Sequence, residues 1–195
     1  MTPGIQMPTR YFKLSDDMAV KGRWLLGAPT DSQGFEVEEW WVFTDGVPVP
    51  NQGPLKFPVD VPGRALDFSI AAFGTPVIHV RVASLLAQMA PSDVQILPVE
   101  IQGQPDQFCI LVATKLIRCI DDAACREVER WTPEDERPEK VGQYRDISGL
   151  RIDPLKVGEA KVFRTWGWSI ALIVSEEIKA ALERIGATGT KFTEV

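Results

Sequence analysis

The chain has 195 residues, of which 45% are hydrophobic and 25% are charged, which is enough apolar material for a packed core without disulfides or a structural metal. Its formal net charge of −6 argues against a nucleic-acid-binding surface, which is normally basic, and favours a basic partner. There is no signal-peptide pattern and no apolar run of the roughly 18 residues that cross a membrane, and the three cysteines fit reduced thiols, so we expect a cytoplasmic protein.

The first part of the chain contains few regular elements. Residues 1–9 hold two prolines and a glycine without a pattern, and we expect a loose arm there. Residues 11–15 are typical of a short strand, and Trp40–Phe43 form a hydrophobic run that would be partly exposed if extended. Residues 54–63 contain three prolines, which remove ladder donors, so this stretch is expected to be an edge strand or an extended loop.

A first helix is predicted at about residues 75–90. Thr75 can cap it, Pro76 suits the first helical position, and Pro91 ends it. One apolar stripe with helical spacing supports the prediction: Ile78, Val82, Leu85 and Met89.

The middle of the chain is rich in strand patterns. Two strands joined by a turn are predicted at residues 94–101 and 107–120. The second is apolar enough to be a central strand buried on both faces. Residues 125–131 fit either a half-exposed strand or a short helix. Further strand-like runs occur at residues 149–153, 160–166, 169–175 and 190–195.

A second helix is predicted at residues 175–186, where Ser175 can cap the start and Gly186 suits the end. Strands outnumber helices and do not alternate with them, so the fold class is α+β: a mostly antiparallel or mixed sheet with two main helices packed on it. Residues 10–195 are expected to form one domain, with residues 10–70 as a candidate smaller lobe.

Recognised catalytic motifs are missing from the sequence. His79 is the single histidine and lies beside an apolar stripe, so a packed role is favoured over a chemical one. The segment CIDDAAC, from Cys119 to Cys125, has neither metal-site nor redox spacing. If residues 107–120 are one strand, Cys109 and Cys119 share a buried face, and Asp121 and Asp122 lie at the turn that follows. A carboxylate site on these two aspartates remains the alternative.

Tryptophan is abundant, with six residues, and it is clustered. Trp40 and Trp41 follow a stretch rich in acids, whereas Trp166 and Trp168 flank a glycine. Core packing is the ordinary role of such residues, but exposed tryptophans are also frequent binding hot spots. The candidate contact residues for a basic protein partner are therefore Glu36, Glu38, Glu39, Trp40, Trp41, Trp166 and Trp168.

The C-terminal third carries a resemblance to a known family. Four of its features resemble a bacterial immunity-protein family that is named for a myxobacterial prototype and was formerly described as a domain of unknown function. They are Phe163-Arg164, the apolar run Ile170–Ser175, the amphipathic helix and the closing pattern from Gly186 to Val195. The segment VQILPVEI and the long strand before CIDD are also similar to that family, and the resemblance covers roughly residues 10–195. The matching positions are apolar and turn residues, which report fold more than function.

The resemblance implies a cytoplasmic, non-enzymatic antidote that binds and neutralises a cognate polymorphic toxin in interbacterial competition, with no cofactor or metal. The alternative is a metal-dependent hydrolase, or an enzyme that removes a toxin's modification, acting through Asp121 and Asp122. A small-ligand-binding module is a third possibility, and would require a deep apolar pocket lined by tryptophans.

Overall fold

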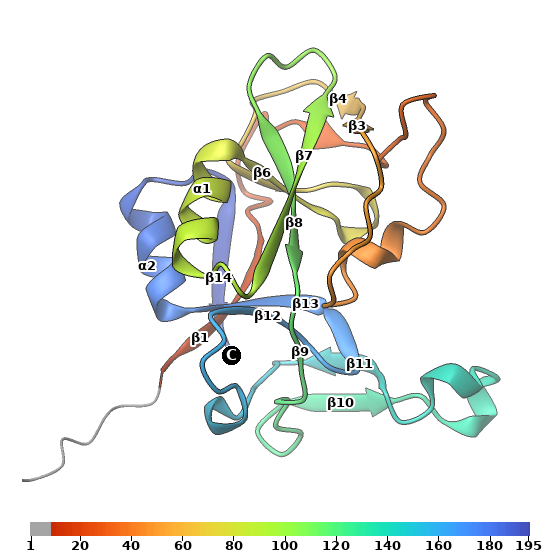
Figure 1. The fold of residues 1–195 in the computed structure, drawn as a ribbon. Helices are drawn as coiled ribbons and strands as arrows, with labels where there is room; N and C mark the ends of the chain where they lie inside the picture. The colour runs from red at the N-terminus through yellow and green to blue at the C-terminus, as the bar shows by residue number, and fades with distance from the viewer. Residues whose placement is uncertain (1–8) are drawn as a thin grey trace, which may run out of the picture.

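The computed structural model describes residues 9–195, and the arm expected at residues 1–9 therefore lies almost entirely outside the described residues. Most strands belong to two five-stranded sheets (Figure 1). The first sheet contains, in spatial order, β14 (Thr190–Glu194), β1 (Tyr11–Asp16), β13 (Trp168–Ser175), β12 (Val162–Thr165) and β9 (Leu116–Ile117). The second sheet contains β3 (Leu55–Phe57), β7 (Val94–Ile101), β8 (Phe108–Ala113), β6 (Pro76–His79) and β5 (Phe68–Ile70).

Two smaller ribbons, two α-helices and five short 3₁₀ helices complete the described fold. The ribbons pair β2 (Leu25–Leu26) with β4 (Val59–Val61), and β10 (Glu127–Arg130) with β11 (Tyr144–Ser148). The helices are α1 (Val80–Met89) and α2 (Glu176–Arg184), which lie side by side in Figure 1. Because β3–β7 and β12–β9 are parallel while the other pairs are antiparallel, the predicted α+β class with mixed sheets is confirmed. Among residues 9–195, no helix is long and apolar enough to cross a membrane.

Three hydrophobic cores hold these layers together. The first lies between the helices and both sheets, the second between the second sheet and the N-terminal segments, and the third between the first sheet and the β10–β11 ribbon. Strand β8 is central in its sheet and buried on both faces, as predicted. Its side chains alternate between the first core, with Cys109, Leu111 and Ala113, and the second core, with Phe108, Ile110 and Val112.

The predicted helix at residues 75–90 is wrong in its first turn. Residues 76–79 form β6, which pairs with both β5 and β8, and the helix begins only at Val80. His79 caps this helix, because its Nδ1 accepts a hydrogen bond from the backbone N–H of Arg81 at 3.2 Å. The strand pairs on one side with the preceding strand β5 and on the other with β8, which is distant in sequence, and this pairing outweighs the local capping signal of Thr75-Pro76.

The long strand predicted at residues 107–120 is divided. It ends at Ala113, and the chain then crosses to the first sheet as β9. Cys109 therefore packs in the first core and Cys119 in the third, and they do not share a face. Residues 127–130 form a strand, which decides between the two structures that fitted residues 125–131.

The second helix follows its sequence signals. The Ser175 hydroxyl accepts a hydrogen bond from the N–H of Ile178, and the C-terminus closes with bonds from Gly186 N–H to Glu183 O and from Ala187 N–H to Leu182 O. This pattern is a Schellman motif with glycine at the left-handed position.

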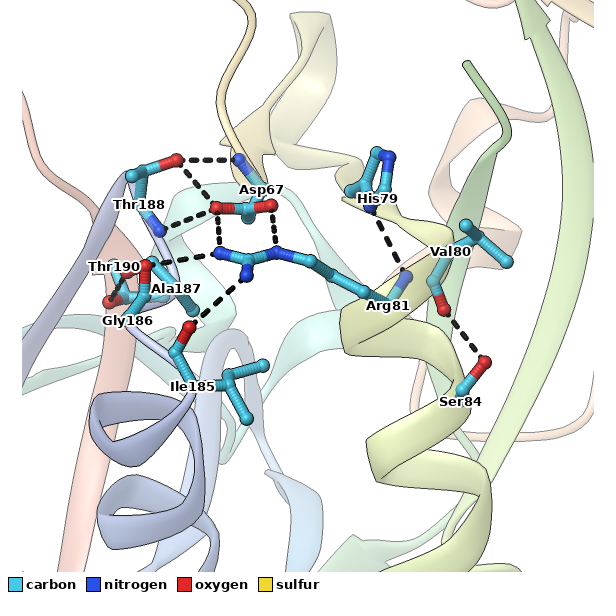
Figure 2. A network of polar contacts seen from close by, with 10 residues as sticks. All are labelled: Asp67, His79, Val80, Arg81, Ser84, Ile185, Gly186, Ala187, Thr188 and Thr190. Carbon is cyan, nitrogen blue, oxygen red and sulfur yellow. Dashed lines mark hydrogen bonds and ion pairs between the residues drawn. The ribbon is translucent and has the colours of Figure 1, made fainter.

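A polar network fixes this helix end to α1 and to the loop before β5 (Figure 2). The Asp67 carboxylate accepts from Arg81 Nε and Nη2 at 2.6 and 2.7 Å, and from the backbone N–H and hydroxyl of Thr188 at 2.8 and 2.7 Å. Arg81 also donates to the carbonyl oxygens of Ile185 and Gly186. The segment GATG (Gly186–Gly189) thus makes long-range contacts as well as ending the helix.

Candidate protein-interaction surface

Three aromatic side chains from two separate segments form an exposed aromatic cluster: Trp40, Trp41 and Phe73. Trp40 stacks on Phe73 with ring centroids 4.6 Å apart and an interplanar angle of 16°, and meets Trp41 edge to face at 5.8 Å. Trp41 is 45% exposed and Phe73 48% exposed. The cluster therefore presents aromatic surface to solvent.

Two short 3₁₀ helices position this cluster. Trp40 and Trp41 begin the helix η1 (Trp40–Phe43), which Phe43 anchors by its complete burial in the second core. The extended conformation assumed for the two tryptophans is therefore wrong. Phe73 lies in η2 (Ala72–Gly74), between β5 and β6.

Phe73 has a strained backbone, with φ of 60°. Bulky residues avoid this left-handed region, at a cost of about 1–3 kcal/mol. Phe73 adopts this conformation where its ring stacks on Trp40. Strained residues cluster at functional sites. No helical or strand spacing connects Phe73 to Trp40 in the sequence. The one local signal is an aromatic residue followed by glycine between two strands.

Three carboxylates precede the cluster in the sequence. Glu36, Glu38 and Glu39 precede η1 along the chain and are all exposed. Within residues 9–195 none of the three forms an ion pair, so their negative charge is available to a partner. Five of the predicted contact residues thus lie in the single segment 36–41, and Phe73 contacts this segment through Trp40.

Trp166 and Trp168 are placed differently. They flank the turn between β12 and β13, where Gly167 has a φ of 82°. The Arg118 guanidinium covers Trp166 at 3.4 Å from the ring centroid, while Trp168 packs against the third core. No aromatic contact among the described residues joins them to the aromatic cluster.

Asp121 and Asp122 are both engaged by neighbouring groups. Asp121 Oδ1 accepts from the backbone N–H groups of Ala123 and Ala124 at 3.2 and 3.3 Å, as expected of a turn residue. Asp122 accepts from the Tyr144 hydroxyl and from Arg130 Nη2, both at 2.6 Å, and these bonds lower its pKa.

The buried thiols are poorly suited to nucleophilic chemistry. Burial raises the pKa of Cys119 to about 12 and also raises the pKa of Cys109. Cys125 Sγ accepts a hydrogen bond from the Arg151 N–H at 3.2 Å. In residues 9–195 there is no group of three His, Cys, Asp or Glu side chains placed to hold a metal ion.

The protein therefore has an α+β fold and exposes an aromatic cluster. Among residues 9–195, the three carboxylates that precede this cluster in the sequence form no ion pairs. No protein-family model matches the chain, and no curated protein is significantly similar to it. The exposed aromatic cluster and the carboxylates that precede it are therefore the features of the chain that bear on its function.

Proposed function

We propose that the protein is an immunity protein that binds a cognate bacterial toxin and neutralises it by stoichiometric contact. The observation that carries this proposal is the aromatic cluster, in which a strained Phe73 stacks on Trp40 beside Trp41. Tryptophan is enriched among residues that dominate binding energy, and rigid aromatic rings lose little entropy on binding. The resemblance of the C-terminal third to an immunity family supports the same function.

The charge of the surface supports a basic toxin. Glu36, Glu38 and Glu39 precede the aromatic cluster in the sequence, and the whole chain carries a net charge of −6. Complementary charge accelerates association at low salt and selects against acidic partners. Binding would cover the toxin's active site or hold the toxin in an inactive conformation, without a chemical step and in the cytoplasm of the producing cell.

Co-expression with the toxin encoded by the neighbouring gene tests this proposal. We expect cells to survive with the wild-type protein and to die with a Trp41→Ala, Phe73→Gly variant, because truncating a hot-spot residue costs about 2 kcal/mol of binding. Glycine accepts the φ of 60° without strain, so the variant should fold. Toxin affinity is measured by calorimetry on the purified proteins.

A matched control separates this surface from exposed apolar residues in general. Val141→Ala, Leu155→Ala removes two side chains that are 44% and 88% exposed and lie outside the cluster. This variant should protect as well as the wild type. Full protection by Trp41→Ala, Phe73→Gly would contradict the assignment of the surface.

The enzymatic alternative makes a different prediction. An Asp121→Asn, Asp122→Asn variant should retain full protection if binding alone neutralises the toxin. It should lose about 1 kcal/mol of stability, because Asp122 loses charge-assisted bonds at a partly exposed site. Protection is scored by survival and stability by urea unfolding. Loss of protection with toxin affinity unchanged would favour an enzyme that uses these aspartates.

A further inference from the structure

An open trough of about 940 Å³ lies between the loop Thr30–Gly34 and the β7–β8 hairpin. Its floor is apolar and includes the exposed Pro54 and Pro98 and the half-buried Val99. The loop forms one wall, and the hairpin tip at residues 104–107 forms another. In Figure 1 the adjoining strands β3 and β7 lie side by side at this end of the second sheet.

The rim of the trough is acidic. It carries three carboxylates, Asp31, Glu100 and Asp106, and one cation, Lys56. Lys56 is paired with Glu100 at 2.8 Å, so the charges of Asp31 and Asp106 are left uncompensated at the rim. An apolar floor with an acidic rim is complementary to side chains that are apolar along the stem and cationic at the end.

The loop that forms the wall is held in shape by its own contacts. Thr30 exchanges backbone hydrogen bonds with Lys56 of β3 at 2.7 and 2.9 Å. Asp31 Oδ1 accepts from the N–H groups of Gln33 and Phe35 at 2.8 and 3.0 Å. The trough is therefore bounded by a preformed wall.

The same loop connects the trough to the acidic residues that precede the aromatic cluster. Thr30 pairs with Glu36 through an isolated β-bridge, and between them Phe35 is 67% exposed. The chain then continues through Glu38 and Glu39 to Trp40. One binding surface can thus run from the trough across Phe35 to the aromatic cluster.

We propose that the trough receives an extended segment of the toxin in which lysine or arginine side chains alternate with apolar ones; this inference rests on the proposed immunity function. The apolar side chains cover the floor, and the cations lie against Asp31 and Asp106 at the rim. The segment adds a second anchoring point to the aromatic cluster and gives the complex its salt dependence.

The test uses the whole protein and a peptide of about eight residues with alternating lysine and leucine. Its affinity is measured at low salt by nuclear magnetic resonance titration, which also maps the site. Asp31→Asn, Asp106→Asn should weaken binding tenfold or more, and the asparagine at position 31 keeps the Oδ1 acceptor that shapes the loop. Glu127→Gln, Glu129→Gln changes the net charge equally on exposed residues of β10 and should weaken binding by less than about threefold.

The expected titration perturbs amides of residues 30–34 and 98–109. An equal loss in both variants, shifts confined to other residues, or equal binding of a glutamate–leucine or a serine–leucine peptide would overturn the proposal. Since protection from the toxin is scored separately, failed protection with trough binding retained contradicts the immunity function alone. Protection without trough binding contradicts the trough alone.

Discussion

Replacing Asp67 by alanine is expected to destabilise the protein by about 2–3 kcal/mol, measured by urea unfolding. The Asp67 side chain is 13% exposed and accepts four hydrogen bonds, from Arg81 and Thr188 (Figure 2). Its loss leaves the Thr188 N–H and the Arg81 guanidinium without their acceptor, and the cost at Arg81 is reduced by solvent screening because that side chain is 43% exposed. The network also joins three chain segments, so its loss weakens their packing together.

A surface ion pair provides the matched control. Lys179 and Glu183 form an i, i+4 pair at 2.8 Å in α2, and Glu183 is 53% exposed. Glu183→Ala should cost no more than about 0.5 kcal/mol, since solvent screens such pairs. Equal effects of the two substitutions would show that the Asp67 network contributes no more than a surface contact.

The same comparison tests the charge of Asp67. Burial alone would raise the pKa of Asp67, but the bonds from Arg81 and Thr188 outweigh it and hold the pKa well below its usual range. A lowered folded pKa means that the stabilisation is present above the unfolded value of about 3.9 and is lost as the pH falls below it. The gap between wild type and Asp67→Ala should therefore be constant from about pH 5 to 8 and shrink below about pH 4. A constant gap at lower pH would contradict a charged Asp67.

Local chemistry predicted the elements that depend on local contacts. The helix α2 follows from the Ser175 cap, its apolar stripe and Gly186, because all of these act within a few residues. Strand β8 follows from its continuous apolar run, which needs burial on both faces. The turn at Asp121 likewise depends on bonds to the next residues.

Elements that depend on distant partners could not be predicted. Residues 76–79 have the start signal of a helix, but pairing with β8, which is distant in sequence, and with the adjacent β5 makes them a strand. The crossing of the chain between sheets after Ala113 separates Cys109 from Cys119, although their spacing suggests one face. Phe73 joins the candidate surface through a stacking contact with Trp40 that no sequence period encodes.

Gly189→Ala is expected to destabilise the protein by about 4 kcal/mol, measured by urea unfolding. Gly189 has a φ of 86°, and a Cβ there would overlap the carbonyl oxygen of Phe68 and lie 3.0 Å from the Leu66 side chain. Because the clash is with backbone, it cannot be relieved by a rotamer change, and the left-handed conformation adds about 1–2 kcal/mol. Relief would require β14 to move away from the loop before β5.

Gly186→Ala separates the two causes. Gly186 also has a positive φ, of 63°, but a Cβ there meets no atom within 4 Å. This variant should cost only the strain of the left-handed conformation, about 1–2 kcal/mol. A loss from Gly189→Ala no greater than that from Gly186→Ala would show that the packing against Phe68 relaxes freely. The larger expected loss of stability from Gly189→Ala means that the two glycines of GATG have different roles. Gly186 ends α2, and Gly189 allows β14 to pass close to the loop that carries Asp67.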